Sequence, residues 1–145
     1  MKSCLLLVLA FVLFAAPVVR SDDPPADKEK IQGTWNVVAM EDGGEKAPPE
    51  EFKGHKWVIT GTTITLSFDK AERGYKLDPS KKPKQLELLA KDGKSRKGIY
   101  LLEGDDLKFC WDASDKAVLP TTFSSKGPPS ADFRLVVLKR EKKKN

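Results

Sequence analysis

Apolar and polar residues alternate with a period of two along most of the chain. The clearest case is 63–68, where Ile64, Leu66 and Phe68 alternate with threonine and serine, and residues 107–112 repeat the pattern. Such alternation is typical of a strand with one buried face. Weaker alternation predicts further strands at 34–40, 56–60, 74–77, 85–90, 98–102 and 133–138, which makes about eight in all.

Short turn signals separate most of these strands. They are the Asp42-Gly43-Gly44, Gly61, Asp92-Gly93 and Glu103-Gly104-Asp105 segments, and short connections join antiparallel neighbours. Two connections are longer: 45–55, where Pro48 and Pro49 predict a brief helix, and 113–130. Helical periodicity is missing from the longer segments, which argues against a βαβ architecture.

A meander of about eight amphipathic strands leaves two open edges, and closure into a barrel removes both. We therefore predict an all-β fold, an antiparallel up-and-down barrel with short helical turns. A barrel of this size is either filled by its own side chains or holds one small ligand, and the sequence leaves both open. The predicted interior comprises Trp35, Val37, Trp57, Ile59, Ile64, Leu66, Phe68, Tyr75, Leu77, Leu86, Leu88, Leu107, Phe109, Trp111, Phe133, Leu135 and Val137.

The N-terminal segment has the layout of a secretory signal peptide. Lys2 is followed by an uncharged apolar run over 5–16, and a small residue at Ser21 fits cleavage before Asp22, with Ala16 as the alternative site. The run is shorter than the about 20 residues that span a bilayer, which disfavours an uncleaved anchor. We expect export to the periplasm, cell envelope or exterior.

These features divide the chain into four parts. We expect a signal peptide at 1–21, a flexible leader at 22–30 that ends in a helical turn, a barrel domain at 31–140 and a basic tail at 141–145. The 39% hydrophobic and 32% charged positions among 145 residues fit one globular domain.

The basic charge is concentrated at the C-terminus. The net charge of +5 falls to +3 without Lys2 and Arg20, and residues 139–145 carry +4 of that. The barrel body is therefore nearly neutral, which argues against nucleic-acid binding. The tail is either a solubilising end that stops strand pairing or a contact for an anionic envelope surface. We expect a monomer that does not span a membrane after cleavage.

Reactive residues are few. Cys4 leaves with the signal peptide, so Cys110 has no partner for an internal disulfide. His55 is the single histidine, and an enzyme would need His55 or Cys110 to meet carboxylates in the fold. The acidic runs at 105–106 and 112–115 lack the spacing of a calcium loop. We predict no catalytic residue, metal or cofactor.

Several motifs carry a family resemblance. The Gln32-Gly33-Thr34-Trp35 segment resembles the Gly-x-Trp signature of lipocalins. With it, segments 75–84, 97–100, 104–108, 123–125 and 135–140 are similar to an uncharacterised lipocalin-like domain family of exported proteins, abundant as paralogues in planctomycete bacteria. The resemblance implies the barrel fold and export but no activity.

The resemblance also implies one structural contact. In lipocalins an arginine near the last strand lies across the tryptophan of the first strand, which here pairs Trp35 with Arg140 or Arg134. The chain departs from typical lipocalins because it is shorter, lacks their disulfide and shows no clear match to their second and third sequence signatures.

Two functions fit these features. The first is an exported, non-catalytic barrel that binds an apolar or amphipathic small molecule. The alternative is a cell-envelope interaction or structural protein with a filled barrel and a tail that contacts an anionic partner. The candidate ligand-binding residues are Trp35, Trp57, Phe68, Tyr75, Tyr100, Phe109, Trp111 and Phe133.

Overall fold

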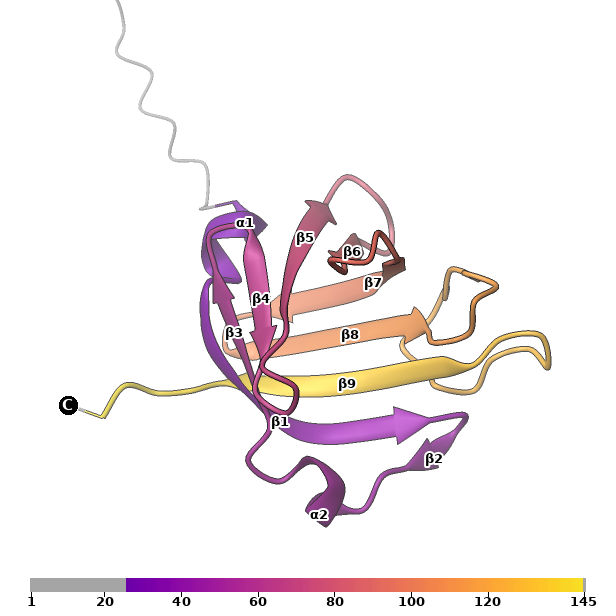
Figure 1. The fold of residues 1–145 in the computed structure, drawn as a ribbon, viewed down its shortest axis with the longest axis horizontal. Coiled ribbons are helices and arrows are strands. Elements are labelled where there is room, and N and C mark those ends of the chain that lie inside the picture. The colour runs from indigo at the N-terminus through magenta and orange to yellow at the C-terminus, as the bar shows by residue number, and fades with distance from the viewer. Residues whose placement is uncertain (1–25, 145) are drawn as a thin grey trace, which may run out of the picture.

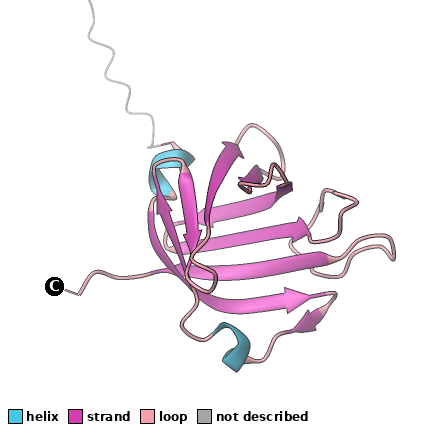
Figure 2. Ribbon diagram, in the orientation of Figure 1, coloured by secondary structure: helices cyan, strands magenta, loops and turns pink. Residues whose placement is uncertain are grey.

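A computed structural model describes residues 26–144, so the expected signal peptide (1–21), residues 22–25 of the leader and residue 145 lie outside the described residues. Within residues 26–144, no helix is long and apolar enough to cross a membrane. Figures 1 and 2 show strands as the dominant elements. In chain order the elements are α1 (Asp27–Lys30), β1 (Gly33–Asp42), β2 (Glu45–Lys46), α2 (Pro49–Phe52), β3 (Lys56–Thr60), β4 (Thr63–Leu66), β5 (Glu72–Asp78), β6 (Gln85–Leu89), β7 (Ser95–Glu103), β8 (Asp106–Asp112) and β9 (Phe133–Arg140).

Eight of the strands form a closed antiparallel barrel, which confirms the predicted fold class. The order is β1-β3-β4-β5-β6-β7-β8-β9, and pairing between β1 and β9 closes the ring. The start of β1 pairs with β3, whereas most of its length pairs with β9. A bulge between Val37 and Ala39 lets β1 bend between these two partners. The short β2 only extends the end of β1.

All eight predicted strand segments coincide with barrel strands, and Pro49 opens the predicted short helix α2. The other long connection, between β8 and β9, contains no regular helix or strand. It packs on the outside of the barrel, where Phe123 contacts a small cluster of Ile99, Cys110 and Leu135. The barrel therefore buries apolar side chains on both faces of β7, β8 and β9.

The sequence predicted the wrong set of alternating β9 residues to point into the barrel. Leu135 belongs to the outer cluster with Val137 packed against it, whereas Val136 and Leu138 belong to the main core inside the barrel. Because side chains alternate, Phe133 also points outward, and it lies against Gly127 of the long connection. With both faces apolar, hydrophobicity alone does not identify the inward one.

Candidate functional site

One end of the barrel is sealed by Trp35 and Arg140, and we call it the closed end. Trp35 is fully buried, and its indole Nε1 donates a hydrogen bond to the carbonyl of Ile31 at 2.8 Å. The Cζ atom of Arg140 lies 4.2 Å from the centre of the indole ring, a cation–π arrangement. Its guanidinium also donates to the carbonyls of Gln32, at 2.6 Å, and Lys30. The last residue of β9 is thus fixed to the segment that leads into β1.

Arg134, the other arginine considered for this contact, lies at the opposite end of the barrel. Its Nε is 3.0 Å from Oδ2 of Asp42, and its Nη2 is 3.9 Å from Oδ2 of Asp132. Arg134 precedes Arg140 by six positions of extended strand, a distance of about 20 Å. The pairing of Trp35 with Arg134 was therefore wrong, and Arg140 makes the contact.

Helix α1 covers the closed end (Figure 1) and is tied to it by Asp27. The Oδ2 of Asp27 accepts hydrogen bonds from Lys84 Nζ and the Tyr100 hydroxyl, both at 2.7 Å. Burial opposes the charge of Asp27, but these two bonds outweigh it and lower its pKa. Burial, reinforced by Asp27, raises the pKa of Tyr100. The helical turn predicted at the end of the leader is present as α1, and these bonds dock it on the barrel.

Aromatic rings fill the middle of the barrel. Phe109 and Tyr100 are 0% and 1% exposed. The Phe109 ring stacks on Trp111, with centroids 5.0 Å apart, and meets Trp57 edge-on at 6.1 Å. Glycine is required at position 98, because a Cβ there would clash with the Cys110 carbonyl oxygen and lie 2.7 Å from the Phe109 ring. The barrel centre is therefore packed rather than hollow.

The other end of the barrel is open, and we call it the mouth. It contains a cavity of about 260 Å³ whose lining comes from all eight barrel strands or the residues next to them. The apolar floor consists of Val37, Trp57, Leu66, Leu88, Trp111 and Val136. Met40, His55, Phe68 and three arginines, Arg73, Arg96 and Arg134, complete the lining.

The mouth brings together only part of the predicted ligand site. The structure places Trp57, Phe68 and Trp111 in its lining. An aromatic side chain favours burial, but the residue type does not show at which height along the barrel axis that side chain lies. The other predicted residues lie elsewhere, with Trp35 and Tyr75 at the closed end, Tyr100 and Phe109 in the packed centre and Phe133 on the outer face.

Sequence reasoning missed the arginines as lining residues, although a signal was present. Arg73 and Arg96 each precede an inward-facing position by two residues, Tyr75 and Gly98 respectively, so strand alternation points them inward. Arg134 has the same relation to Val136. Extending the alternation by one step at the start of β5 and β7 would have found Arg73 and Arg96, whereas Arg134 lies on the face of β9 that the sequence had predicted to point outward.

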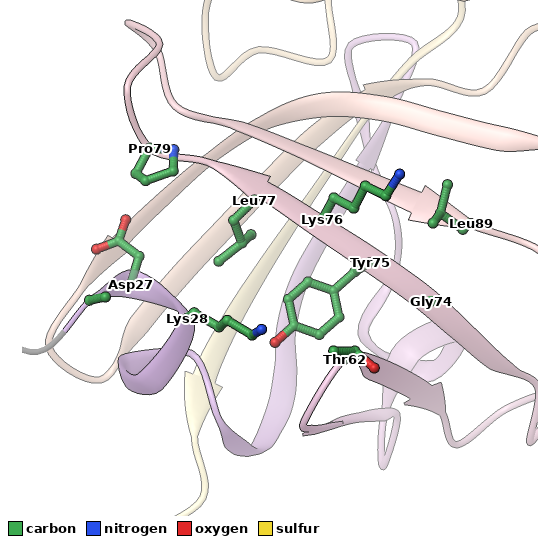
Figure 3. A pocket seen from close by; sticks show the side chains of 10 residues that line it. Asp27, Lys28, Thr62, Gly74, Tyr75, Lys76, Leu77, Pro79 and Leu89 are labelled. Atoms are coloured by element: carbon green, nitrogen blue, oxygen red, sulfur yellow. The ribbon is translucent and has the colours of Figure 1, made fainter.

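A wider hollow of about 630 Å³ lies between α1 and β5, and Figure 3 shows the side chains that border it. Two of its polar side chains, Asp27 and Tyr75, are already engaged. Asp27 is bonded as described, and the Tyr75 hydroxyl donates to the carbonyl of Gly61 and accepts from Gln32 Nε2, both at 2.9 Å. Burial raises the pKa of Tyr75 despite that bond from Gln32. This groove is a seam between the α1 lid and the barrel, and it is more open to solvent than the mouth cavity.

Asp112, the last residue of β8, anchors the long connection beside the mouth. It is 2% exposed and accepts backbone hydrogen bonds from Ser114, Val118 and Asp132 at 2.8–3.0 Å. Burial raises the pKa of this carboxyl, but the bonds outweigh it and set its pKa to about 2. On the same strand, burial raises the pKa of Cys110 to about 11, so its thiol stays protonated at neutral pH.

The basic tail begins at the closed end. The two basic residues just before it, at the end of β9, are engaged within the barrel, because Arg140 binds Asp105 and Lys139 lies 3.3 Å from Asp106. Glu141 pairs with Lys56 at 2.6 Å. The exposed basic residues beyond the barrel are those at 142–144.

No family model, curated protein or solved structure matches the chain. Membership of the lipocalin-like family stays a prediction, and the closed eight-stranded antiparallel barrel is the established result.

Proposed function

We propose that the protein is an exported, non-catalytic barrel that binds a small apolar or amphipathic molecule in its mouth. The observation that carries this proposal is the apolar cavity above the packed aromatic centre. Its volume of about 260 Å³ is near the lower limit of small-molecule pockets, which favours a small ligand. Burial of an alkyl chain or ring contributes about 25 cal/mol per Å² of apolar surface removed from water.

The mouth supports this role better than the other parts of the barrel. Trp35 and Arg140 seal the closed end, and the rings around Phe109 occupy the centre. At the mouth, Phe68 is 57% exposed and packs against His55 with ring centroids 5.3 Å apart. An exposed aromatic residue beside an apolar cavity gains contacts when a ligand covers it.

The test is a titration of the protein with octanol, followed by saturation-transfer NMR of the ligand signals. Met40→Trp places a larger ring in the mouth, whereas Val38→Trp places it at a 43% exposed position of the same strand outside the lining. We expect saturable binding to the unmodified chain and to Val38→Trp, and much weaker binding to Met40→Trp. Thermal unfolding verifies that both variants are folded. Absence of binding to the unmodified chain, or equal binding by both variants, would contradict the proposal.

The exposed tail supports a second candidate, contact with an anionic envelope surface. Its lysines at 142–144 extend beyond the last strand, and their attraction to an anionic surface is screened by salt. Deletion of residues 142–145 should weaken sedimentation with phosphatidylglycerol vesicles at low salt. Unchanged sedimentation would remove the tail from this role.

A further inference from the structure

Three arginine side chains end in the mouth, and each comes from a different strand. Arg73, Arg96 and Arg134 occupy the first inward positions of β5, β7 and β9. Arg73, Arg96 and Leu88 also border a second hollow of about 320 Å³, together with Asp92 and Lys94. Within residues 26–144, the mouth lining contains these three cations and His55 but no aspartate or glutamate.

Carboxylates hold the arginines from the outside. Asp69 accepts hydrogen bonds from both terminal nitrogens of Arg73, and Arg73 Nη1 also donates to the carbonyl of Ala71 at 3.2 Å. Arg96 Nη1 donates to the carbonyl of Ser114 at 3.4 Å and lies 3.7 Å from Oδ1 of Asp115. Arg134 pairs with Asp42 and Asp132 as described above.

These contacts leave the arginines able to bind a further anion. A guanidinium has five N–H donors, and the observed contacts use one or two nitrogens of each arginine. Asp115 is 88% exposed, so water screens its charge more than that of Arg96, which is 36% exposed. An anion seated against the apolar floor would be less solvated and would interact more strongly with the guanidinium groups.

The geometry points to a small amphipathic monoanion, such as a medium-chain carboxylate, as the ligand class. Its apolar part would lie against Trp57, Leu66 and Val136, and its carboxylate would lie among the arginines. This inference rests on the proposed function and adds the charge of the ligand. An extended polyanion is disfavoured because Asp42, Asp69, Asp115 and Asp132 surround the same rim and would repel it.

The test compares three ligands with the same eight-carbon chain: octanoate, octanol and octylammonium. Saturation-transfer titrations at neutral pH should show octanoate binding about tenfold more tightly than octanol, which is the contribution expected of one charge-assisted hydrogen bond. Octylammonium should bind more weakly than octanol. If octanol binds as tightly as octanoate, the inference fails and the proposed function stands. If none of the three binds, both fail.

A matched pair of variants tests the location of the charge. Arg96→Gln removes an inward cation of β7, and Lys97→Gln removes its exposed neighbour on the outer face. We expect Arg96→Gln to weaken octanoate binding about tenfold and octanol binding much less, and Lys97→Gln to leave both unchanged. Equal effects of the two variants would show a general charge effect and overturn the inference. Thermal unfolding distinguishes loss of binding from loss of fold.

Discussion

Strand β9 carries an inward arginine at each end, and the two have different surroundings. Arg140, 27% exposed at its side chain, lies over Trp35 and donates to two backbone carbonyls and to Asp105. Arg134, 44% exposed, lies in the mouth and pairs with the carboxylates of Asp42 and Asp132 at the rim. The same residue type on one face of one strand is therefore structural at one end of the barrel and available to a ligand at the other.

The path of the chain explains this difference. At the closed end, residues 27–32 cross the barrel and supply the carbonyl groups that Arg140 needs. At the mouth, α2 packs Phe52 into the main core beside β1, and the connection after β8 packs on the outer face, so neither lines the mouth cavity. The mouth is open because no segment crosses it among the described residues.

The largest expected effect comes from removing the closed-end ring. Trp35→Ala should lower the free energy of unfolding by about 3–5 kcal/mol, because it leaves a cavity in the core and removes the surface on which Arg140 rests. Trp111→Ala, a matched change in the partly exposed mouth lining, should cost less than half as much. Urea unfolding of both variants measures the difference, and equal losses would contradict the division between the two ends.

The two arginines of β9 give the next largest contrast. Arg140→Ala removes the cation–π contact and the hydrogen bonds to residues 30 and 32, so it should cost about 2–3 kcal/mol. Arg134→Ala removes exposed ion pairs and should cost less than about 0.5 kcal/mol. Thermal and urea unfolding would reveal these values. A larger loss for Arg134→Ala would reverse the assignment of roles.

Asp112 should make the stability of the long connection depend on pH. Its folded pKa of about 2 lies below the unfolded value near 3.9, so the stabilisation is complete above pH 4 and is lost as pH falls through 2. Asp112→Asn should therefore be about 2 kcal/mol less stable at pH 7, and the difference should shrink toward pH 2. A stability difference that does not vary with pH would contradict the role of the Asp112 carboxylate in anchoring the connection after β8.

The smallest effect on stability is expected at Phe68. Because its side chain is 57% exposed, Phe68→Ser should change the free energy of unfolding by less than about 0.5 kcal/mol. It should still weaken octanol binding several-fold, since the ring lines the mouth. Unfolding curves and the same NMR titration separate the two effects, and unchanged binding would exclude Phe68 from the site.

Strand alternation predicted every barrel strand because each has at least one clearly apolar face. It failed at Phe133 and Arg134. There the connection after β8 buries the outer face as well, so both sets of alternating residues are largely apolar and the pattern does not identify the inward set. The docking of α1 was not predictable from the pattern either, since it depends on Asp27 meeting Lys84 and Tyr100 across the fold. Which end is sealed likewise follows from tertiary contacts, not from local periodicity.

Ligands should enter the barrel at the mouth and not at the closed end. The most direct measurement is a series of two-dimensional amide NMR spectra of the full chain during titration with octanoate. We predict saturable shifts at residues around the mouth, such as His55, Phe68 and Arg134, with little change at Gln32 and Gly61 near the α1 groove. Shifts confined to the α1 groove, or none at saturating octanoate, would contradict the account.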